Sequence, residues 1–166
     1  TIHDGLSDDQ VFCFSGSRNN DLFWIGTEGP GLSYYSYDED KIYTLSQQSI
    51  QPIRRVHSIC EVNYSILWIA TAGDGLLEVT IQKDNHRFFV KNIEVYTFQR
   101  RGRVCNEFHS MIFDEDSMLY IGSRGGYGVI KFNIYSKDFE FLPLGNTENS
   151  AIGDVWSVHL SMDSVV

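Results

Sequence analysis

A five-residue segment occurs three times in this chain and constrains its fold more than any other feature. Phe23–Thr27 reads Phe-Trp-Ile-Gly-Thr, Leu67–Thr71 reads Leu-Trp-Ile-Ala-Thr, and Leu119–Ser123 reads Leu-Tyr-Ile-Gly-Ser. Each copy has a large apolar residue, an indole or phenol ring, Ile, a very small residue and a hydroxyl. Because the copies lie 44 and 52 residues apart, the chain is predicted to consist of structural repeats of about this length.

Each copy belongs to a series of four short apolar segments that are separated by turn residues, without helical periodicity. In the first repeat the segments are Val11–Phe14, Phe23–Thr27, Leu32–Tyr37 and Ile42–Leu45. The insertion at 82–92 is rich in charge and Asn, and it is expected to be a long outer loop. The predicted units cover about 8–46, 53–98 and 104–143, and the first strand of a fourth unit is expected at about 153–162.

The repeated segment is apolar on both faces of a strand, which requires another sheet on each side. Radially packed four-stranded antiparallel sheets, the blades of a β-propeller, meet this requirement. An up-and-down sandwich or barrel is the alternative, but it would not require a repeated pentapeptide. The small residue of each copy is then expected where the neighbouring blade approaches closely, and the hydroxyl is expected to bond across the following turn. The predicted fold is all-β, with about three blades and one further strand.

Composition narrows the classes of function. The net charge of −9 argues against a general nucleic-acid-binding surface. No apolar run has the length that crosses a bilayer, so this segment is not expected to insert into a membrane. The three cysteines have no CxxC or metal-finger spacing, and buried free thiols are expected at Cys13 and Cys60. The sequence contains no motif for a cofactor.

The arginines fall in a pattern that indicates a binding surface. Six of the eight lie in segments that enter a first strand or join a second strand to a third, and such loops share one face of a propeller. Arginine binds carboxylate and sulfate groups bidentately, which favours an anion-attracting surface for acidic or sulfated sugars or for a partner domain. The alternative is solvated loop charge that pairs with Asp74, Glu107 and Asp154. Tyr127 and Trp156 lie near this face and could stack on a sugar ring or pack between blades. The candidate ligand-binding residues are Arg54, Arg55, Arg100, Arg101, Arg103, Arg124, Tyr127 and Trp156.

Two further groups were considered as sites of chemistry. His57 and His109 occupy equivalent places in consecutive first strands, but a zinc site needs three or four ligands, so packed, hydrogen-bonded histidines are expected instead. The acidic turns 38–40 and 114–116 contain paired carboxylates, the groups that hydrolyse glycosides. They lie at opposite ends of strands, in turns that favour Asp for its conformation. Catalysis by this segment is therefore not expected.

The repeats resemble the two-component regulator propeller repeat, over essentially the whole chain. The resemblance is carried by Asp4–Ser7 (Asp-Gly-Leu-Ser), by Phe23–Thr27 with Gly31-Leu32, and by Leu67–Thr71 with Gly75-Leu76. The third copy departs from the pattern, with Tyr120 for Trp and Gly128-Val129 for Gly-Leu. Such repeats form seven-bladed propellers in the periplasmic sensor regions of hybrid two-component histidine kinases, many of which respond to polysaccharide fragments.

The resemblance implies a non-catalytic, periplasmic, ligand-sensing segment of a two-component receptor, with an oligosaccharide as the expected ligand. The alternatives are a propeller scaffold for protein–protein interaction and a propeller glycosidase or lyase. Three blades and a strand do not close a seven-bladed ring, so we expect a piece of a longer sensor. Its open strand edges are templates for association, which predicts self-association with a second copy.

Overall fold

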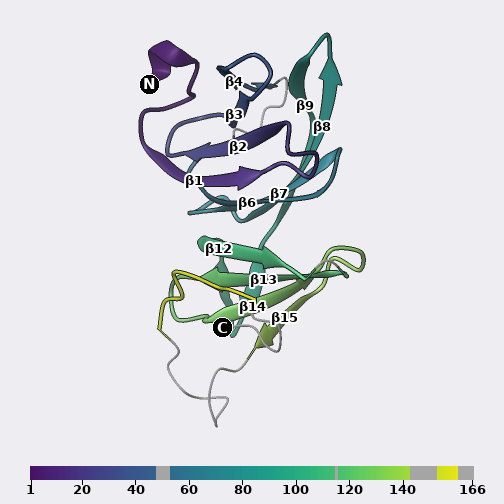
Figure 1. Cartoon of the computed structure of the whole chain (residues 1–166). Coiled ribbons are helices and arrows are strands. Elements are labelled where there is room, and N and C mark those ends of the chain that lie inside the picture. Colours follow the sequence, from purple (N-terminus) through teal and green to yellow (C-terminus); the bar gives the residue numbers. More distant parts are fainter. Residues whose placement is uncertain (48–52, 115, 143–152, 161–166) are drawn as a thin grey trace.

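A computed structural model describes residues 1–47, 53–114, 116–142 and 153–160, and it is built almost entirely from strands (Figure 1). Three sheets follow one another along the chain, and each contains four antiparallel strands that pair in sequence order. Sheet 1 contains β1 (Val11–Gly16), β2 (Leu22–Thr27), β3 (Ser33–Ser36) and β4 (Lys41–Thr44). Sheet 2 contains β6 (Val56–Asn63), β7 (Ile66–Thr71), β8 (Leu76–Asp84) and β9 (Arg87–Tyr96). Sheet 3 contains β12 (Phe108–Phe113), β13 (Met118–Ser123), β14 (Val129–Asn133) and β15 (Phe139–Leu142). The prediction of an all-β chain with four-stranded antiparallel sheets is confirmed.

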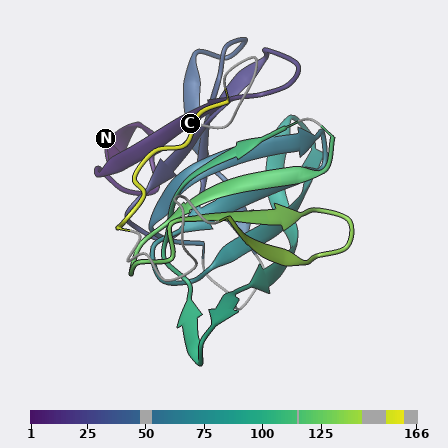
Figure 2. The same ribbon diagram turned by 90° about the horizontal axis from the view of Figure 1, so that it is seen from below.

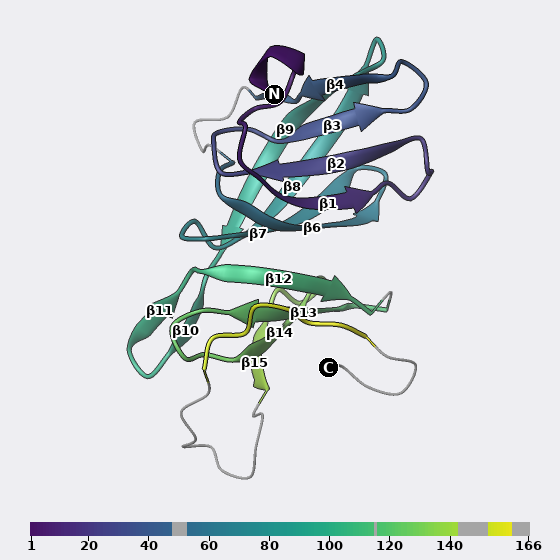
Figure 3. The same ribbon diagram turned by 60° about the vertical axis from the view of Figure 1, so that its left-hand side comes forward.

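The sheets pack face to face, with their first strands side by side. β6 lies between β1 and β12 and contacts both (Figure 3). One core forms between sheets 1 and 2 around Trp24, Leu67 and Val79, and a second forms between sheets 2 and 3 around Trp68 and Phe132. The ring of each second strand, where it is Trp, is therefore buried against the following sheet.

The small residue of the repeated segment lies where the next repeat presses closest. A Cβ on Gly26 would lie 2.5 Å from the Val56 side chain and 2.8 Å from the Val56 carbonyl oxygen. A Cβ on Gly122 would lie 2.7 Å from the Val155 carbonyl oxygen, and Ala70 is fully buried at the equivalent place. The expected role of these residues in close packing is confirmed.

The hydroxyl that ends each copy is also buried and bonded. Thr71 Oγ1 donates to the Gly75 carbonyl at 2.7 Å, and Ser123 Oγ donates to the Gly128 carbonyl at 2.7 Å, so each spans the turn that follows. Thr27 differs, because its Oγ1 lies 2.8 Å from Ser7 Oγ. The hydroxyl of the first copy thus fixes the N-terminal Asp-Gly-Leu-Ser segment, which begins at the last residue of the 3-10 helix η1 (Ile2–Asp4).

Several expectations are wrong in detail. The expected outer loop at 82–92 is a hairpin, because β8 and β9 continue to a two-residue turn at Asn85 and His86, both with positive φ. The short strand β5 (Ser46–Gln47) adds a fifth, parallel strand to sheet 2 beside β9. Strands β10 (Phe98–Arg100) and β11 (Arg103–Cys105) form a separate hairpin that projects from the sheets (Figure 2).

The expected first strand of a fourth unit is not a strand over 153–160. A first strand is held by pairing with its own second strand, and none pairs with this segment in the part of the chain that the structure describes. The segment is anchored instead by the Val155 amide, which donates to the Ser123 carbonyl at 3.0 Å. The described residues contain no helix that could cross a membrane.

Candidate functional site

One end of the sheets carries a continuous belt of backbone hydrogen bonds, which we call the rim. It joins the turn between the second and third strands of a sheet both to the segment that enters the same sheet and to the segment that enters the next sheet. The Arg55 amide donates to the Glu28 carbonyl, the Ala72 amide to the Arg55 carbonyl, and the Arg124 amide to the Glu107 carbonyl, all at 3.0–3.1 Å. The isolated bridge between Ala72 and Glu107 completes the belt. The rim is therefore a rigid frame for its side chains.

Three of the predicted arginines lie on this rim, and each is ion-paired. Arg54 Nε lies 2.9 Å from the Asp74 carboxylate, and Arg55 Nε lies 3.5 Å from that of Glu28. Arg124 lies between two acids, 3.5 Å from Glu107 and 3.8 Å from Asp154. The alternative interpretation, solvated loop charge with local pairing, predicted this arrangement. In it Arg54 pairs with Asp74, and Arg124 pairs with Glu107 and Asp154. These ion pairs are half exposed, so each contributes little to stability.

The other three arginines belong to the β10–β11 hairpin. Arg100 and Arg103 face each other across the two strands, and Arg101 occupies the tip with positive φ. The Arg100 guanidinium lies over the Phe141 ring at 3.3 Å, a cation–π contact. These arginines extend the rim outward beside sheet 3.

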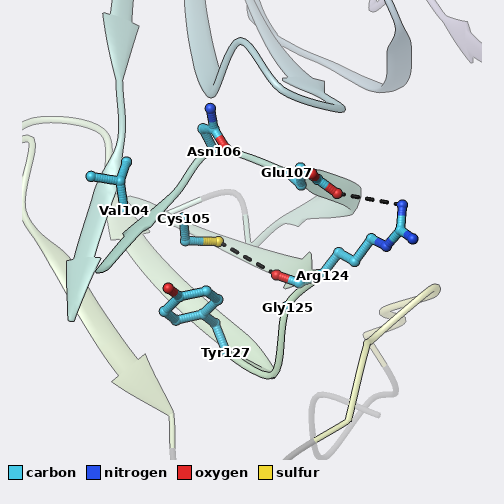
Figure 4. Close-up of a pocket in the computed structure, with 7 residues that line it drawn as sticks. All are labelled: Val104, Cys105, Asn106, Glu107, Arg124, Gly125 and Tyr127. Carbon is cyan, nitrogen blue, oxygen red and sulfur yellow. Dashed lines mark hydrogen bonds and ion pairs between the residues drawn. The ribbon is translucent and has the colours of Figure 1, made fainter. Parts of the chain in front are cut away.

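A hollow of about 330 Å³ lies where the hairpin meets the rim, and we call it the rim pocket (Figure 4). Its lining comes from the end of β11, the segment that enters β12 and the turn between β13 and β14. The lining residues are Val104, Cys105, Asn106, Glu107, Arg124, Gly125 and Tyr127.

The rim pocket offers an ion pair on one side and an aromatic ring on the other. Figure 4 shows the pair of Glu107 and Arg124 across the pocket from the Tyr127 ring. Tyr127 is half-buried and is supported edge-on by Phe98, with ring centroids 6.2 Å apart. Burial raises the pKa of the Cys105 thiol to about 11, so the thiol is not a nucleophile at neutral pH.

Trp156 does not lie in the rim pocket. It is exposed beside the first strands, with its ring centroid 4.5 Å from that of His109. There it forms a row of rings with His57 and Phe12, each 4.5–4.7 Å from the next, along an open hollow of about 500 Å³. The structure therefore brings Arg124 and Tyr127 together and places Trp156 in a second hollow.

The two histidines of this row are packed and hydrogen-bonded, as predicted. Their Nδ1 atoms lie 3.2 Å apart, so in the neutral pair one ring donates its Nδ1–H and the other, protonated on Nε2, accepts it. Burial lowers the pKa of His57, with a further contribution from His109, and burial also lowers the pKa of His109. No group of three or more His, Cys, Asp or Glu residues able to hold a metal occurs among the described residues.

Sequence reasoning missed a third hollow, of about 210 Å³, between sheets 1 and 2 at the end opposite the rim. Its floor is the buried Glu61 carboxylate, which accepts a 2.7 Å hydrogen bond from Trp24 Nε1. Burial raises the pKa of Glu61. The sequence signal that could have indicated this hollow is the lone carboxylate of Glu61 within the apolar segment Ile59–Val62. The acidic turns, by contrast, are structural: Glu39 pairs with Arg87, and Asp114 accepts the backbone amides of the turn that follows it.

Solved structures with a similar arrangement of sheets include extracellular domains of signalling systems. The extracellular domain of BT4673 from B. thetaiotaomicron, described as a hybrid two-component system, superposes with a TM-score of 0.64 at 17% identity. The match covers 82% of this chain and 19% of that one. A second structure of the BT4673 extracellular domain, described as that of a one-component system, gives a TM-score of 0.60 at 15% identity, with 95% and 20% covered. The chain shares the fold of these extracellular domains.

The expected likeness to two-component sensors is thereby confirmed at the level of fold. This chain spans about a fifth of the length of those structures. No family model matches the sequence. No curated protein matches it either.

Proposed function

We propose that this chain is a non-catalytic segment of the extracytoplasmic sensor domain of a two-component receptor, and that its three sheets are blades of a propeller. The radial order supports the propeller, because the first strands lie side by side and the later strands of each sheet follow outward. The shared fold with extracellular domains of signalling receptors supports the sensing role and the periplasmic location.

We also propose that the segment binds an acidic or sulfated oligosaccharide at the rim pocket. The observation that carries this proposal is the placement of Arg124 and Tyr127 on opposite sides of one hollow. The Arg124 side chain is 55% exposed, and its ion-pair distances of 3.5 and 3.8 Å are long. It can therefore exchange a weak carboxylate partner for a bidentate ligand anion, while the Tyr127 ring packs on a sugar face.

Calorimetric titration of the chain with neutral, uronic-acid and sulfated oligosaccharides tests this proposal. We expect binding of an acidic or sulfated member of the panel and at least about tenfold weaker binding to the Arg124→Gln variant, because a charge-assisted hydrogen bond contributes about 1.5–3 kcal/mol. Arg87→Gln is the matched control, because Arg87 is 50% exposed and also ion-paired, but lies on the β8–β9 hairpin.

Two results would contradict the rim-pocket proposal. One is equal loss of affinity in the Arg124→Gln and Arg87→Gln variants, which would show a general charge effect. The other is the absence of binding by every acidic and sulfated member at millimolar concentration.

A further inference from the structure

The third hollow, at the end of the sheets opposite the rim, has an interior that packing alone does not explain, and we call it the acidic hollow. Its walls come from the β1–β2 turn, the β6–β7 turn and the β8–β9 hairpin, which stands beside sheet 1 (Figure 1). Its floor is Glu61, which is only 8% exposed. Among the described residues, no Lys or Arg is ion-paired with this carboxylate, and Trp24 is the one side chain that bonds to it. A buried charge is costly unless it is paired.

The internal repeats show that packing does not require a carboxylate at this place. Glu61 lies opposite Leu67 on β7, and Phe113 lies opposite Leu119 on β13, so Glu61 and Phe113 are equivalent residues of sheets 2 and 3. In sheet 3 the place is filled by an apolar ring that packs against the second core. The acid in sheet 2 therefore departs from the repeat, and departures from the rules of packing are expected at functional sites.

The interface between sheets 2 and 3 contains the kind of ion that would complete this arrangement. There the Lys137 ammonium lies 4.7 Å from the centroid of the Trp68 ring and 2.6 Å from a carboxylate oxygen of Glu78, so an acid, an aromatic ring and an ammonium group meet. The acidic hollow has the acid and the rings. The lysine in its lining, Lys83, lies over the Phe88 ring at 5.1 Å and forms no ion pair with a described residue.

We propose that the acidic hollow binds a small organic ammonium ion, at a site separate from the rim pocket and for a ligand of opposite charge. The ammonium group pairs with Glu61 and Asp21, which both line the hollow, and the carbon atoms of the ligand lie against Tyr64 and Phe88. The hollow has a volume of about 210 Å³, which suits a ligand of this size. Burial raises the pKa of Glu61 against the opposing effects of Trp24 and Arg18, and the Asp21 carboxylate raises it further. A cation beside both acids stabilises their charged forms.

The charges around the acidic hollow also favour a cation. A second hollow of about 270 Å³ adjoins it, shares four lining residues with it and adds the acids Asp38 and Glu39. Glu39 is paired with Arg87, which leaves three carboxylates and one lysine, Lys83, in the two linings. Arg54, Arg55 and Arg124, by contrast, lie at the other end of the sheets, on the rim. This end of the sheets therefore attracts cations.

Titration of the whole chain, labelled for NMR, with n-butylammonium chloride tests the proposal. The indole N–H of Trp24 reports on the acidic hollow because it donates to Glu61, and the indole signals of Trp68 and Trp156 serve as internal references. We expect a saturable shift of the Trp24 signal, with a dissociation constant in the millimolar range for so small a ligand. The neutral analogue n-butanol is expected to bind at least about tenfold more weakly. Phosphate buffer is used, because Tris is itself an organic ammonium ion.

Two substitutions identify the acid that binds the cation. Glu61→Gln removes the charge but keeps an oxygen that accepts the hydrogen bond from Trp24, so the indole signal verifies the fold. It is expected to weaken n-butylammonium binding at least about tenfold. Glu140→Gln is the matched control, because it changes the net charge equally and its side chain is 67% exposed on β15. If Glu61→Gln does not fold, Asp21→Asn replaces it, with weakening of several-fold expected.

The outcomes are distinct. Binding that persists in Glu140→Gln and is weakened in the variant of the acidic hollow supports the proposal. A Trp24 signal that does not move up to about 100 mM n-butylammonium overturns it, as does equal weakening by both substitutions. Equal affinity for n-butanol also overturns it, because the hollow would then bind neutral molecules. None of these outcomes depends on ligand binding at the rim pocket, so the two proposals can fail separately.

Discussion

The substitution Gly26→Ala tests the close approach of neighbouring sheets at a single atom. The new Cβ would lie 2.5 Å from Val56 Cγ1, 2.5 Å from Cys13 Sγ and 2.8 Å from the Val56 carbonyl oxygen. Carbon–carbon contacts are ordinarily about 3.5–4.0 Å, so the first contact is about 1 Å too short. The Cys13 side chain can rotate away, but the Val56 backbone belongs to β6 and moves only with its strand.

The expected cost follows from this geometry. Adding one carbon to a packed core costs about 1–3 kcal/mol when side chains and backbone must shift. Because the obstructing atom is backbone, we expect the upper part of this range, about 2–3 kcal/mol. For a domain of this size 1 kcal/mol corresponds to about 2–4 °C in Tm, so Gly26→Ala is expected to lower the melting temperature by roughly 5–10 °C.

Urea and thermal unfolding, followed by tryptophan fluorescence, give both quantities. Trp24 lies two residues before Gly26 and belongs to the first core, and Trp68 belongs to the second, so the signal reports on both cores. Gly16→Ala is the control, because a Cβ on Gly16, at the end of β1, meets no atom within 4 Å. If Gly26→Ala has the same stability as Gly16→Ala within about 0.5 kcal/mol, the sheets do not pack as the structure shows.

Two further predictions concern stability. Burial lowers the pKa of both His57 and His109. Near the ordinary histidine pKa of about 6.5, the folded chain therefore binds fewer protons than the unfolded chain. The free energy of unfolding consequently decreases as the pH falls through that value. The double variant His57→Phe/His109→Phe, which repeats the ring found at Phe12, is expected to lose less stability between pH 7.5 and pH 5 in urea titrations; an unchanged loss would rule out the pair as its source. Thr71→Val removes the hydrogen bond to the Gly75 carbonyl and is expected to cost about 1–3 kcal/mol in the same assay, and a loss below about 0.5 kcal/mol would mean that the hydroxyl does not hold the turn.

The repeated segment predicted the fold because its ring, its small residue and its hydroxyl each have a role that packing or a turn hydrogen bond determines. Trp24 and Trp68 lie between sheets, Gly26 and Gly122 lie at the closest approach, and Thr71 closes a turn. Each role requires one kind of residue, so the pattern is visible in the sequence. The hairpin at 82–92 was not predicted because polar and charged residues at 82–87 interrupt the apolar pattern, although Phe88 and Val90 beyond them pack into the core between sheets 1 and 2.

The candidate site was predictable only in part. Loop positions indicated that Arg54, Arg55 and Arg124 would share one end of the sheets, since the strand order fixes which loops lie together. The rim pocket itself depends on the β10–β11 hairpin, whose place beside Tyr127 is a tertiary contact with no local signal. The repeat position of Trp156 predicted a place beside the other first strands, but it predicted neither that its segment is not a strand nor the hollow that its ring lines.

The rim belt also determines which pieces of this chain can be exchanged as modules. The turn at 28–31 is bonded to the segment that enters sheet 2, through the Arg55 amide on Glu28 and the Gly31 amide on the Ile53 carbonyl. A recombination event that divides the chain at the boundary between two sequence repeats would separate these partners. The segment that can be exchanged as a unit therefore does not coincide with one sequence repeat. It must include the turn of one sheet together with the segment that enters the following sheet. Duplication of repeats in this architecture would preserve stability only when each turn is copied together with the entry segment to which it is bonded.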